Sequence, residues 1–372
     1  MSLCSAYELQ FSDGGEQLVV LKRYRGDKAA ALAQRDQRTS RGDGELPSAL
    51  LPSAVVSDER LHLWCEGDDR ELPGPQRLGD MRRTKRLLAA QGVFAPLQLR
   101  SHRSRLTRLR YRPERRAVYR LDAALRGDDG ARGEGRLAVR ALPPDVAARV
   151  VVHRTDHGGA SFLPRLVASE PRSGLLFEEW LDVTSCADDD FQNAAVAGTL
   201  LAQLHRPAPA SAGAAPAAPS GDEPLFAWNS QLAELAGTPT RALHSGPGHW
   251  THGDFHPDQL AFTRDGGEPR LLDLDGLAPG DHHADLADWI ADELVARPHT
   301  DLRRAGAALL ASYADAGGPV VDREHLSRRV QLALVCRAAA SLRRLEVNGL
   351  AKAQHTLELA RHIGAGAMAG RG

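Results

Sequence analysis

The first half of the chain alternates apolar and polar residues at the spacing of β-strands. The segments YELQF and QLVVLKRY flank the turn Ser12-Asp13-Gly14-Gly15 and predict a hairpin over residues 7–24. The segments RLTRLRYR and RRAVYRLDAAL lie on either side of Pro113-Glu114 and predict a second hairpin, followed by a strand at 135–142. Further elements are expected at 61–65 (a strand), 76–91 (a basic amphipathic helix) and 161–182 (two short strands).

The second half, from about residue 188, carries apolar residues at helical spacing. The segment FQNAAVAGTLLAQLH predicts a helix, and the acidic residues Asp188–Asp190 at its start favour the helix dipole. Residues 207–224 are a Pro/Ala/Ser-rich stretch that we expect to be a flexible surface insertion and not a domain boundary. Other helices are expected at 228–244, 284–297, 301–315, 323–345 and 350–363.

Length and composition narrow the classes of protein. A chain of 372 residues is expected to form about two domains or one two-lobed unit. A formal net charge of −1 and 5% aromatic residues give no reason to expect a nucleic-acid partner or a membrane surface. Four scattered cysteines predict neither a zinc site nor a disulfide framework. With no long apolar run and no signal-like start, the sequence predicts a cytoplasmic protein.

Two segments of the second half carry the chemistry. HGDFHPDQ at 252–259 places Asp254 between two histidines in a short loop. DLDGLAPGDHHADLADW at 273–289 begins with Asp273, at the end of the apolar run RLLDLD. Phosphoryl transfer requires such a pair, because one carboxylate orients and deprotonates the attacking hydroxyl while another holds magnesium on the nucleotide phosphates.

Together the two segments resemble the HGDxHxxN loop and the IDFxxxxxGDxxxDLA segment of the aminoglycoside phosphotransferase and choline kinase-like family. LAQLH at 201–205 and the strands RYRPERRAVYRL and LAVRAL match that family more weakly, so the resemblance covers about 104–345. It implies an α+β, bilobal protein kinase-like fold. The expected parts are an N-terminal extension packed with the N-lobe (1–100), a small, mainly antiparallel β N-lobe (101–182) and a larger helical C-lobe (183–372).

The resemblance also implies a set of catalytic and metal-binding residues. Asp254 is the expected catalytic base, and Asp273 the expected ligand of Mg²⁺. Gln259 stands where the family has asparagine, and its amide oxygen is a candidate second metal ligand. Asp275 would share a strand face with Asp273 and so could add to the metal or contact the substrate, although a solvated turn residue is an equal alternative.

The histidines of the two segments leave more than one interpretation open. His252 and His256 belong to the predicted catalytic set, but His252 is expected to order the loop more than to transfer protons. For His256, loop packing and a substrate contact stay equal alternatives. Asp285 opens a helix and is expected to fix the catalytic loop without a chemical role. The adjacent His282 and His283 are expected at the surface and not on a metal.

The nucleotide-binding half departs from the family pattern. Arg140 stands where a strand lysine would contact the α- and β-phosphates, with Lys22 as a competing candidate. No glutamate occurs between residues 135 and 169, so the usual helical partner of that cation is missing. Arg115, in the turn after Pro113, is a candidate to reach the phosphates, and a solvated basic hairpin is an equal alternative. The backbone of Glu179 and Trp180 is expected to bind the adenine edge.

The sequence therefore predicts an ATP- or GTP-dependent phosphotransferase that uses Mg²⁺ and a small-molecule hydroxyl acceptor, such as an aminoglycoside, a sugar or another metabolite. A degenerate kinase fold that binds a nucleotide or partner without turnover is one alternative. A kinase for peptide serine or threonine is another. A metal hydrolase is disfavoured because HGDFHPDQ lacks the HxHxDH-type spacing. The sequence determines neither the acceptor nor the oligomeric state.

Overall fold

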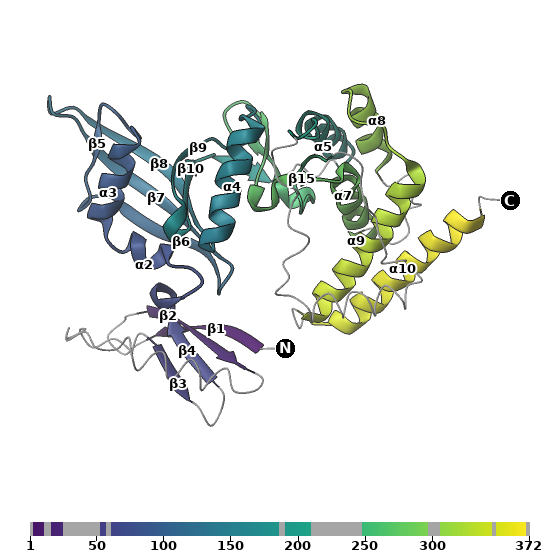
Figure 1. The fold of residues 1–372 in the computed structure, drawn as a ribbon, viewed down its shortest axis with the longest axis horizontal. Helices are drawn as coiled ribbons and strands as arrows, with labels where there is room; N and C mark the ends of the chain where they lie inside the picture. Colours follow the sequence, from purple (N-terminus) through teal and green to yellow (C-terminus); the bar gives the residue numbers. More distant parts are fainter. Residues whose placement is uncertain are drawn as a thin grey trace. The chain divides into compact units, whose positions relative to one another are not determined.

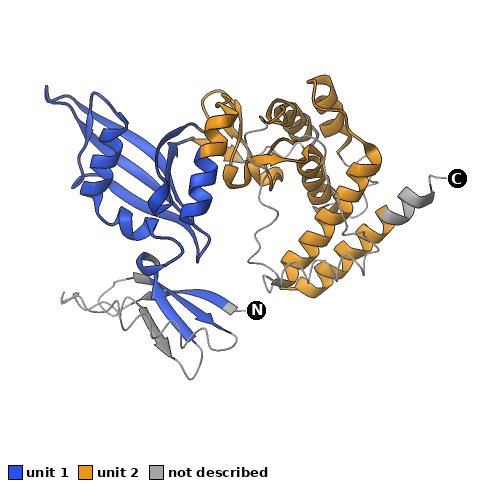
Figure 2. Cartoon of the chain, in the orientation of Figure 1, with its two compact units in different colours: residues 1–151, 165–180 blue, residues 152–164, 181–372 orange. Residues whose placement is uncertain are grey.

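The computed structural model describes residues 3–10, 16–24, 53–56, 61–185, 190–209, 248–296, 306–343 and 347–369. The chain divides into two compact units, which Figure 2 colours separately. Unit 1 comprises residues 1–151 and 165–180, and unit 2 comprises 152–164 and 181–372. The boundaries expected at 100/101 and 182/183 stay predictions. The predicted helix at 228–244 and most of the predicted insertion lie outside the described residues.

Unit 1 begins with a four-stranded antiparallel sheet in the order β1-β2-β4-β3. The predicted first hairpin is confirmed as β1 (Leu3–Gln10) and β2 (Glu16–Arg23), and the strand expected at 61–65 is β4 (Leu61–Cys65). The sheet adds β3 (Ser53–Val56), which pairs with β4. Val20 and Trp64 are almost completely buried, so this sheet has its own apolar side.

The second sheet of unit 1 has six antiparallel strands, in the order β5-β7-β8-β10-β9 with β6 paired to β7. Buried and partly exposed residues alternate along β7, as the alternating sequence predicts. Leu121, Val139 and Phe177 form its buried side together with Leu78 and Leu88 from two helices that lie across the sheet (Figure 1). The strands are β5 (Gln98–Leu99), β6 (Arg105–Arg112), β7 (Arg116–Arg126), β8 (Arg132–Ala141), β9 (Leu166–Glu170) and β10 (Leu175–Glu179).

The single helix expected at 76–91 is wrong, because the structure has two helices there. The first is α2 (Gly74–Leu78) and the second is α3 (Met81–Ala90). Asp80 separates them, and its side chain accepts hydrogen bonds from the backbone N–H groups of Arg82 (3.0 Å) and Arg83 (3.3 Å). A side chain that caps one helix holds a non-helical backbone itself, so it ends the preceding helix.

Unit 2 is mainly helical around one buried core that includes Leu201, Leu286, Leu334 and Tyr313. Helices α5 and α8 approach closely at Gly198, where an added Cβ would lie 2.2 Å from the carbonyl oxygen of Leu309. Its helices are α5 (Asp190–Leu204), α7 (His282–Ala296), α8 (Ala307–Asp315), α9 (Arg323–Arg343) and α10 (Gly349–Ala369). They match the predicted helical segments wherever those segments are described.

Two small antiparallel sheets complete unit 2 and carry the motif segments. One contains β11 (Val183–Ser185), β13 (Leu260–Thr263) and β14 (Pro269–Leu271), and the other pairs β12 (His249–Thr251) with β15 (Ala278–Gly280). With sheets in unit 1 and mostly helices in unit 2, the predicted α+β class is confirmed. Helix α4 (Pro144–His157) contains the division between the units.

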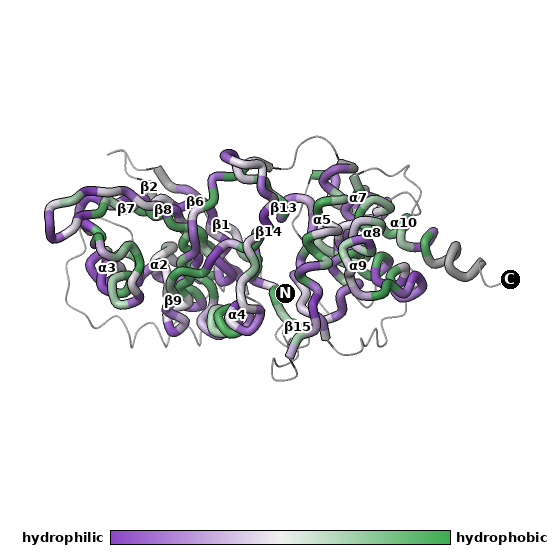
Figure 3. Tube along the Cα trace, turned by 90° about the horizontal axis from the view of Figure 1, so that it is seen from above, coloured by the Kyte–Doolittle hydropathy of each residue, from purple (hydrophilic) through white to green (hydrophobic). Residues whose placement is uncertain are grey.

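Hydrophilic residues are interspersed with hydrophobic ones along the helices of unit 2 (Figure 3). None of the helices in the described part of the chain is long and apolar enough to cross a membrane.

Candidate active site

The loop that follows β12 presents Asp254 to solvent. Its neighbours His252 and Phe255 are buried with no measurable exposure, whereas Asp254 is exposed. The Phe255 ring stacks on Trp289 of α7, with ring centroids 5.3 Å apart and an interplanar angle of 25°. Within the described residues, no hydrogen bond or ion pair engages the Asp254 carboxylate. A carboxylate held on an anchored loop and left without a partner is suited to accept a proton from a substrate.

The backbone of this loop is fixed by Asp285, which is fully buried near the start of α7. Its carboxylate accepts hydrogen bonds from the backbone N–H groups of His252 (2.6 Å) and Gly253 (2.9 Å) and from Nε2 of His205 (2.9 Å). Burial opposes the charged form, but these hydrogen bonds outweigh it and lower the pKa of Asp285. These contacts are the loop-fixing interaction that the sequence predicts for Asp285.

The network extends from Asp285 into the helical core. Because the ionised carboxylate only accepts, Nε2 of His205 carries a proton, and in the neutral ring Nδ1 is then the acceptor. The hydroxyl group of Tyr313 on α8 donates to that Nδ1 at 2.8 Å. Through these contacts the position of Asp254 depends on α7, on α8 and on His205, which directly follows α5.

The loop also lies directly against the segment that carries Asp273. Gly253 has a φ of +86°, and a Cβ placed there would lie 2.7 Å from the carbonyl oxygen of Gly276. Nε2 of His252 donates to the carbonyl oxygen of Leu272 at 2.7 Å. The two motif segments, which are separate in sequence, are therefore joined by backbone contact in the fold.

The two histidines of the loop differ in their surroundings. His252 is fully buried and its Nε2 is bonded to Leu272, so its side chain supports the loop and does not face a substrate. This favours the structural interpretation of His252 over the catalytic one. His256 is partly exposed, and its Nε2 lies 3.1 Å from the amide nitrogen of Gln259. Loop packing accounts for that contact, and the other ring nitrogen of His256 faces Asp258 at 3.9 Å.

The predicted metal ligands lie on adjoining backbone. The N–H of Leu272 donates to the carbonyl oxygen of Gln259 at 2.8 Å, which places Gln259 beside the residue that precedes Asp273. The hydrogen bond to His256 uses the amide nitrogen of Gln259, so it does not consume the amide oxygen. Carboxylate and amide oxygens are the hard ligands that Mg²⁺ prefers, so the donor set fits this ion.

The expectation that Asp273 and Asp275 share a strand face is wrong. Strand β14 ends at Leu271, and Asp273 has a left-handed backbone conformation (φ +56°, ψ +56°). A 3-10 turn then spans Leu274–Gly276. Residues two positions apart share a face only in an extended strand. In this turn, the side chains of Asp273 and Asp275 therefore do not share a face. Left-handed conformations of this kind are costly for residues other than glycine and gather at functional sites.

His282 and His283 are buried, so the prediction that they lie at the surface is wrong. Asp281 accepts hydrogen bonds from His283 Nδ1 (2.8 Å), His325 Nε2 (2.6 Å) and Arg329 Nε (2.6 Å). Burial raises the pKa of Asp281, but the hydrogen bonds outweigh it and hold that pKa well below its usual range. Ligand atoms of Asp281, His282 and His283 lie within 4.8 Å of one another. Because Arg329 already neutralises Asp281, this cluster is a hydrogen-bonded link between α7 and α9.

In unit 1, Arg140 has a carboxylate partner that the sequence does not reveal. Arg140 of β8 and Glu178 of β10 are both buried, and Nη2 of Arg140 donates to Glu178 at 3.0 Å. In the ladder Arg140 faces Leu176 while Glu178 faces Ala138, so the two side chains are diagonal neighbours on one face. The missing helical glutamate is thus replaced by one from the next strand. A glutamate that directly follows the apolar run LLF in the strand LLFEE is the signal that could have identified it.

The turn that carries Arg115 is held by residues from the first hundred. The carboxylate of Asp69 accepts from the backbone N–H of Glu114 (2.8 Å) and from the hydroxyl group of Tyr111 (2.7 Å). Lys22 forms an ion pair with the Glu114 side chain. Lys22 is therefore committed to this turn, and the competing assignment of Lys22 to the phosphates is disfavoured. Arg115 itself is exposed.

Some polar groups of the segment expected to bind the adenine edge already form hydrogen bonds within the protein. The backbone N–H of Glu179 donates to the carbonyl oxygen of Arg165 at 2.9 Å, and the Glu179 side chain accepts from the N–H of Arg165 at 2.9 Å. The guanidinium of Arg120 lies 5.8 Å from the ring centroid of Trp180. An adenine edge would have to use backbone groups other than the N–H of Glu179.

The fold and these sites define an α+β protein with an exposed carboxylate, Asp254, on an anchored loop. No protein-family model matches the chain, and no curated protein matches it. Solved structures to which it is similar include macrolide 2'-phosphotransferase from Brachybacterium faecium (20% identity, covering 74% of this chain and 97% of that one, TM-score 0.43). Choline kinase from Cryptosporidium parvum Iowa II is another (10% identity, 72% and 91% coverage, TM-score 0.48).

A third similar structure is an aminoglycoside phosphotransferase from Alicyclobacillus acidocaldarius (13% identity, 66% and 89% coverage, TM-score 0.42). These structures are of the group that the two motif segments resemble. Identities of 20% or less and TM-scores below 0.5 do not transfer an activity from those proteins to this chain.

Proposed function

We propose that this protein is a phosphotransferase that moves the γ-phosphate of ATP or GTP to a hydroxyl group of a small molecule. The observation that carries the proposal is the exposed Asp254 on a loop whose backbone is fixed by the buried Asp285. Backbone contact between Gly253 and Gly276 supports a shared role for the two motif segments. Few other chemistries require two carboxylate-bearing segments in this arrangement.

In this proposal Asp254 holds the acceptor hydroxyl and takes its proton as the phosphoryl group is transferred. Asp273, with the amide oxygen of Gln259, would hold Mg²⁺. Bound there, the ion would supply charge stabilisation for the nucleotide phosphates. On the nucleotide side, Arg140 is the candidate cation for the phosphates, and its Nη2 donates to Glu178 at 3.0 Å.

The acceptor is proposed to lie along α7, beyond the catalytic loop. Asp285 and Trp289 contact this loop, and Asp288 and Asp292 continue along the same helix. Nη2 of Arg337 donates to the carbonyl oxygen of Asp288 at 2.7 Å and lies 3.2 Å from the Asp292 carboxylate. Because Arg337 neutralises part of this acidic surface, a neutral or weakly basic hydroxyl compound is favoured over a polycation.

The test is a screen of hydroxyl acceptors with γ-labelled ATP and GTP. Asp254→Ala should lower turnover about 10²- to 10⁴-fold, as expected for loss of a positioned proton acceptor. Asp273→Ala should remove magnesium-dependent turnover. Asp258→Ala is the matched control, because Asp258 lies in the same loop with a 92% exposed side chain. Turnover that survives Asp254→Ala at the level of the Asp258→Ala control would contradict the proposed mechanism.

A further inference from the structure

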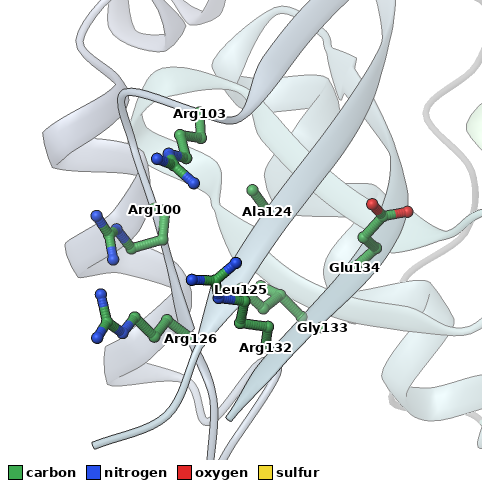
Figure 4. A pocket seen from close by; sticks show the side chains of 8 residues that line it. All are labelled: Arg100, Arg103, Ala124, Leu125, Arg126, Arg132, Gly133 and Glu134. Atoms are coloured by element: carbon green, nitrogen blue, oxygen red, sulfur yellow. The ribbon is translucent and has the colours of Figure 1, made fainter. Parts of the chain in front are cut away.

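Unit 1 contains a pocket of about 420 Å³ that includes none of the candidate active-site residues. It lies where strands β7 and β8 meet the turn that follows β5, and Figure 4 shows the side chains that line it. Arg100 and Arg103 come from that turn, Arg126 ends β7 and Arg132 begins β8. The other lining residues are Ala124, Leu125, Gly133 and Glu134.

The charge of this pocket is not balanced by the protein. Four arginines and one glutamate give the lining a net charge of +3. Across the described residues, none of the four guanidinium groups pairs with a carboxylate, and Arg100 has only His102 Nε2 at 3.2 Å. The carboxylate of Glu134 lies apart from the guanidinium groups in Figure 4.

Some other arginines of unit 1 are paired with carboxylates. Arg77 lies 2.7 Å from Glu170, and Arg120 lies 2.9 Å from Asp122. The four pocket arginines differ in having no carboxylate partner of this kind among the described residues. What distinguishes this pocket is that four such arginines line one cavity.

The backbone geometry makes the cluster unfavourable without a ligand. Arg126 and Arg132 are directly opposite each other in the β7–β8 ladder. Like charges at such positions destabilise a sheet by a few tenths of a kcal/mol to about 1 kcal/mol. Ala124 lies two residues before Arg126 and so shares its face of the sheet. Its small side chain leaves room between the arginines, which a larger residue would fill.

We propose that this pocket binds a small molecule carrying two adjacent phosphate groups. A guanidinium group binds phosphate oxygens through two parallel hydrogen bonds, and four such groups can engage two phosphates. A phosphate carries about −1.5 to −2 at neutral pH, so two of them balance the charge of the lining. The limited size of the pocket, about 420 Å³, favours a compact diphosphate over an extended polyanion such as a nucleic-acid strand.

The test measures pyrophosphate binding to the full chain by calorimetry, in a buffer with EDTA and without magnesium. The pocket variant is Arg126→Ala with Arg132→Ala, and the matched control is Arg172→Ala, an exposed arginine of unit 1 outside the pocket. Arg115→Ala is included because Arg115 is a candidate for nucleotide phosphates. We expect the pocket variant to bind pyrophosphate at least ten-fold more weakly than wild type, while both single variants bind as wild type does.

A thermal melt of the pocket variant separates a binding defect from a folding defect. Without ligand the variant should melt at or above the wild-type temperature, because the opposed like charges are gone. With pyrophosphate only the wild type and the two single variants should gain stability. Equal affinity in the pocket variant and wild type would overturn the proposal. So would binding of a short oligonucleotide that depends on these arginines while pyrophosphate does not bind. Loss of phosphotransferase activity in any assay leaves this binding test unaffected.

Discussion

Replacing Asp285 with asparagine should destabilise unit 2 by removing the anion that holds the catalytic loop. The wild-type carboxylate accepts from the backbone N–H groups of His252 and Gly253 and from Nε2 of His205. Asparagine has nearly the same shape but only one acceptor oxygen. Its amide nitrogen would therefore point at one of these donors, with no exposed direction to turn to because the site is fully buried.

The expected magnitude follows from the hydrogen bonds that the substitution removes. Hydrogen bonds to a charged group contribute about 1.5–3 kcal/mol each, and breaking a buried charged network costs about 3–5 kcal/mol. We therefore expect the free energy of unfolding to fall by about 3–5 kcal/mol for Asp285→Asn. The free energy of unfolding of a whole domain is only about 5–15 kcal/mol, so this loss should shift a denaturant unfolding curve clearly.

Urea unfolding followed by circular dichroism and tryptophan fluorescence provides the assay. Trp250 and Trp289 are both buried in unit 2, and Trp289 stacks on Phe255 of the loop. Asp258→Asn is the control, with the same chemical change in the same loop at a 92% exposed side chain. We expect the control to change the free energy of unfolding by less than about 0.5 kcal/mol.

The pH dependence gives a second check. The folded pKa of Asp285 is lowered, so the charged form stabilises the fold above the unfolded pKa of about 4 and this contribution is lost as pH falls further. The difference between wild type and Asp285→Asn should therefore shrink below about pH 4. If Asp285→Asn unfolds within about 1 kcal/mol of wild type at pH 7, the carboxylate does not hold the loop and the reasoning is refuted.

Three other changes test separate parts of the fold. Gly253→Ala should lower the free energy of unfolding by about 1–3 kcal/mol and should also lower turnover. The residue has a φ of +86°, and an added Cβ would lie 2.7 Å from the carbonyl oxygen of Gly276. Unchanged stability in a urea titration would contradict this. Glu178→Gln should lower the free energy of unfolding by about 3–5 kcal/mol, because the buried Arg140 loses the carboxylate of Glu178. A melting temperature equal to that of wild type would show that the ion pair does not contribute to stability. Burial lowers the pKa of His282 from 6.5 to about 4, so the unfolded chain takes up its proton first and stability should fall by up to about 2 kcal/mol between pH 6.5 and 5. His282→Gln should reduce that slope, as measured from urea midpoints at the two pH values.

The structure removes one of the reasons for the degenerate-kinase alternative. That alternative rested partly on the absence of a glutamate near Arg140, and Glu178 supplies that carboxylate from β10. Arg140, in place of a lysine, and Gln259, in place of an asparagine, stay departures from the family pattern. Magnesium-dependent nucleotide consumption in the acceptor screen decides between a catalytic and a non-catalytic protein, since a protein without turnover would show none.

The strands and helices, and the loop around Asp254, were predictable because their signals are local. The alternation along β7 and the helical spacing along α5 depend only on residues a few positions apart. The function of Asp285 was also predictable, since a carboxylate at a helix start close to a loop motif has few other uses. The prediction of a single helix at 76–91 was wrong because Asp80 caps the second helix, and this capping competes with continuation of the first.

The remaining parts of the site depend on tertiary contacts between distant residues. The partner of Arg140 lies 38 residues away, and sheet order and register decide that pairing. Asp69 holds a turn 45 residues further on, and burial of His282 depends on the packing of α7 against its neighbours. The left-handed turn at Asp273 ends the strand on which Asp275 was expected. The sequence by itself indicated the carboxylate loop and most of the elements, although not helix α4, because their signals lie within single segments. Only the tertiary structure decided which charges are neutralised, because each neutralising partner comes from another segment.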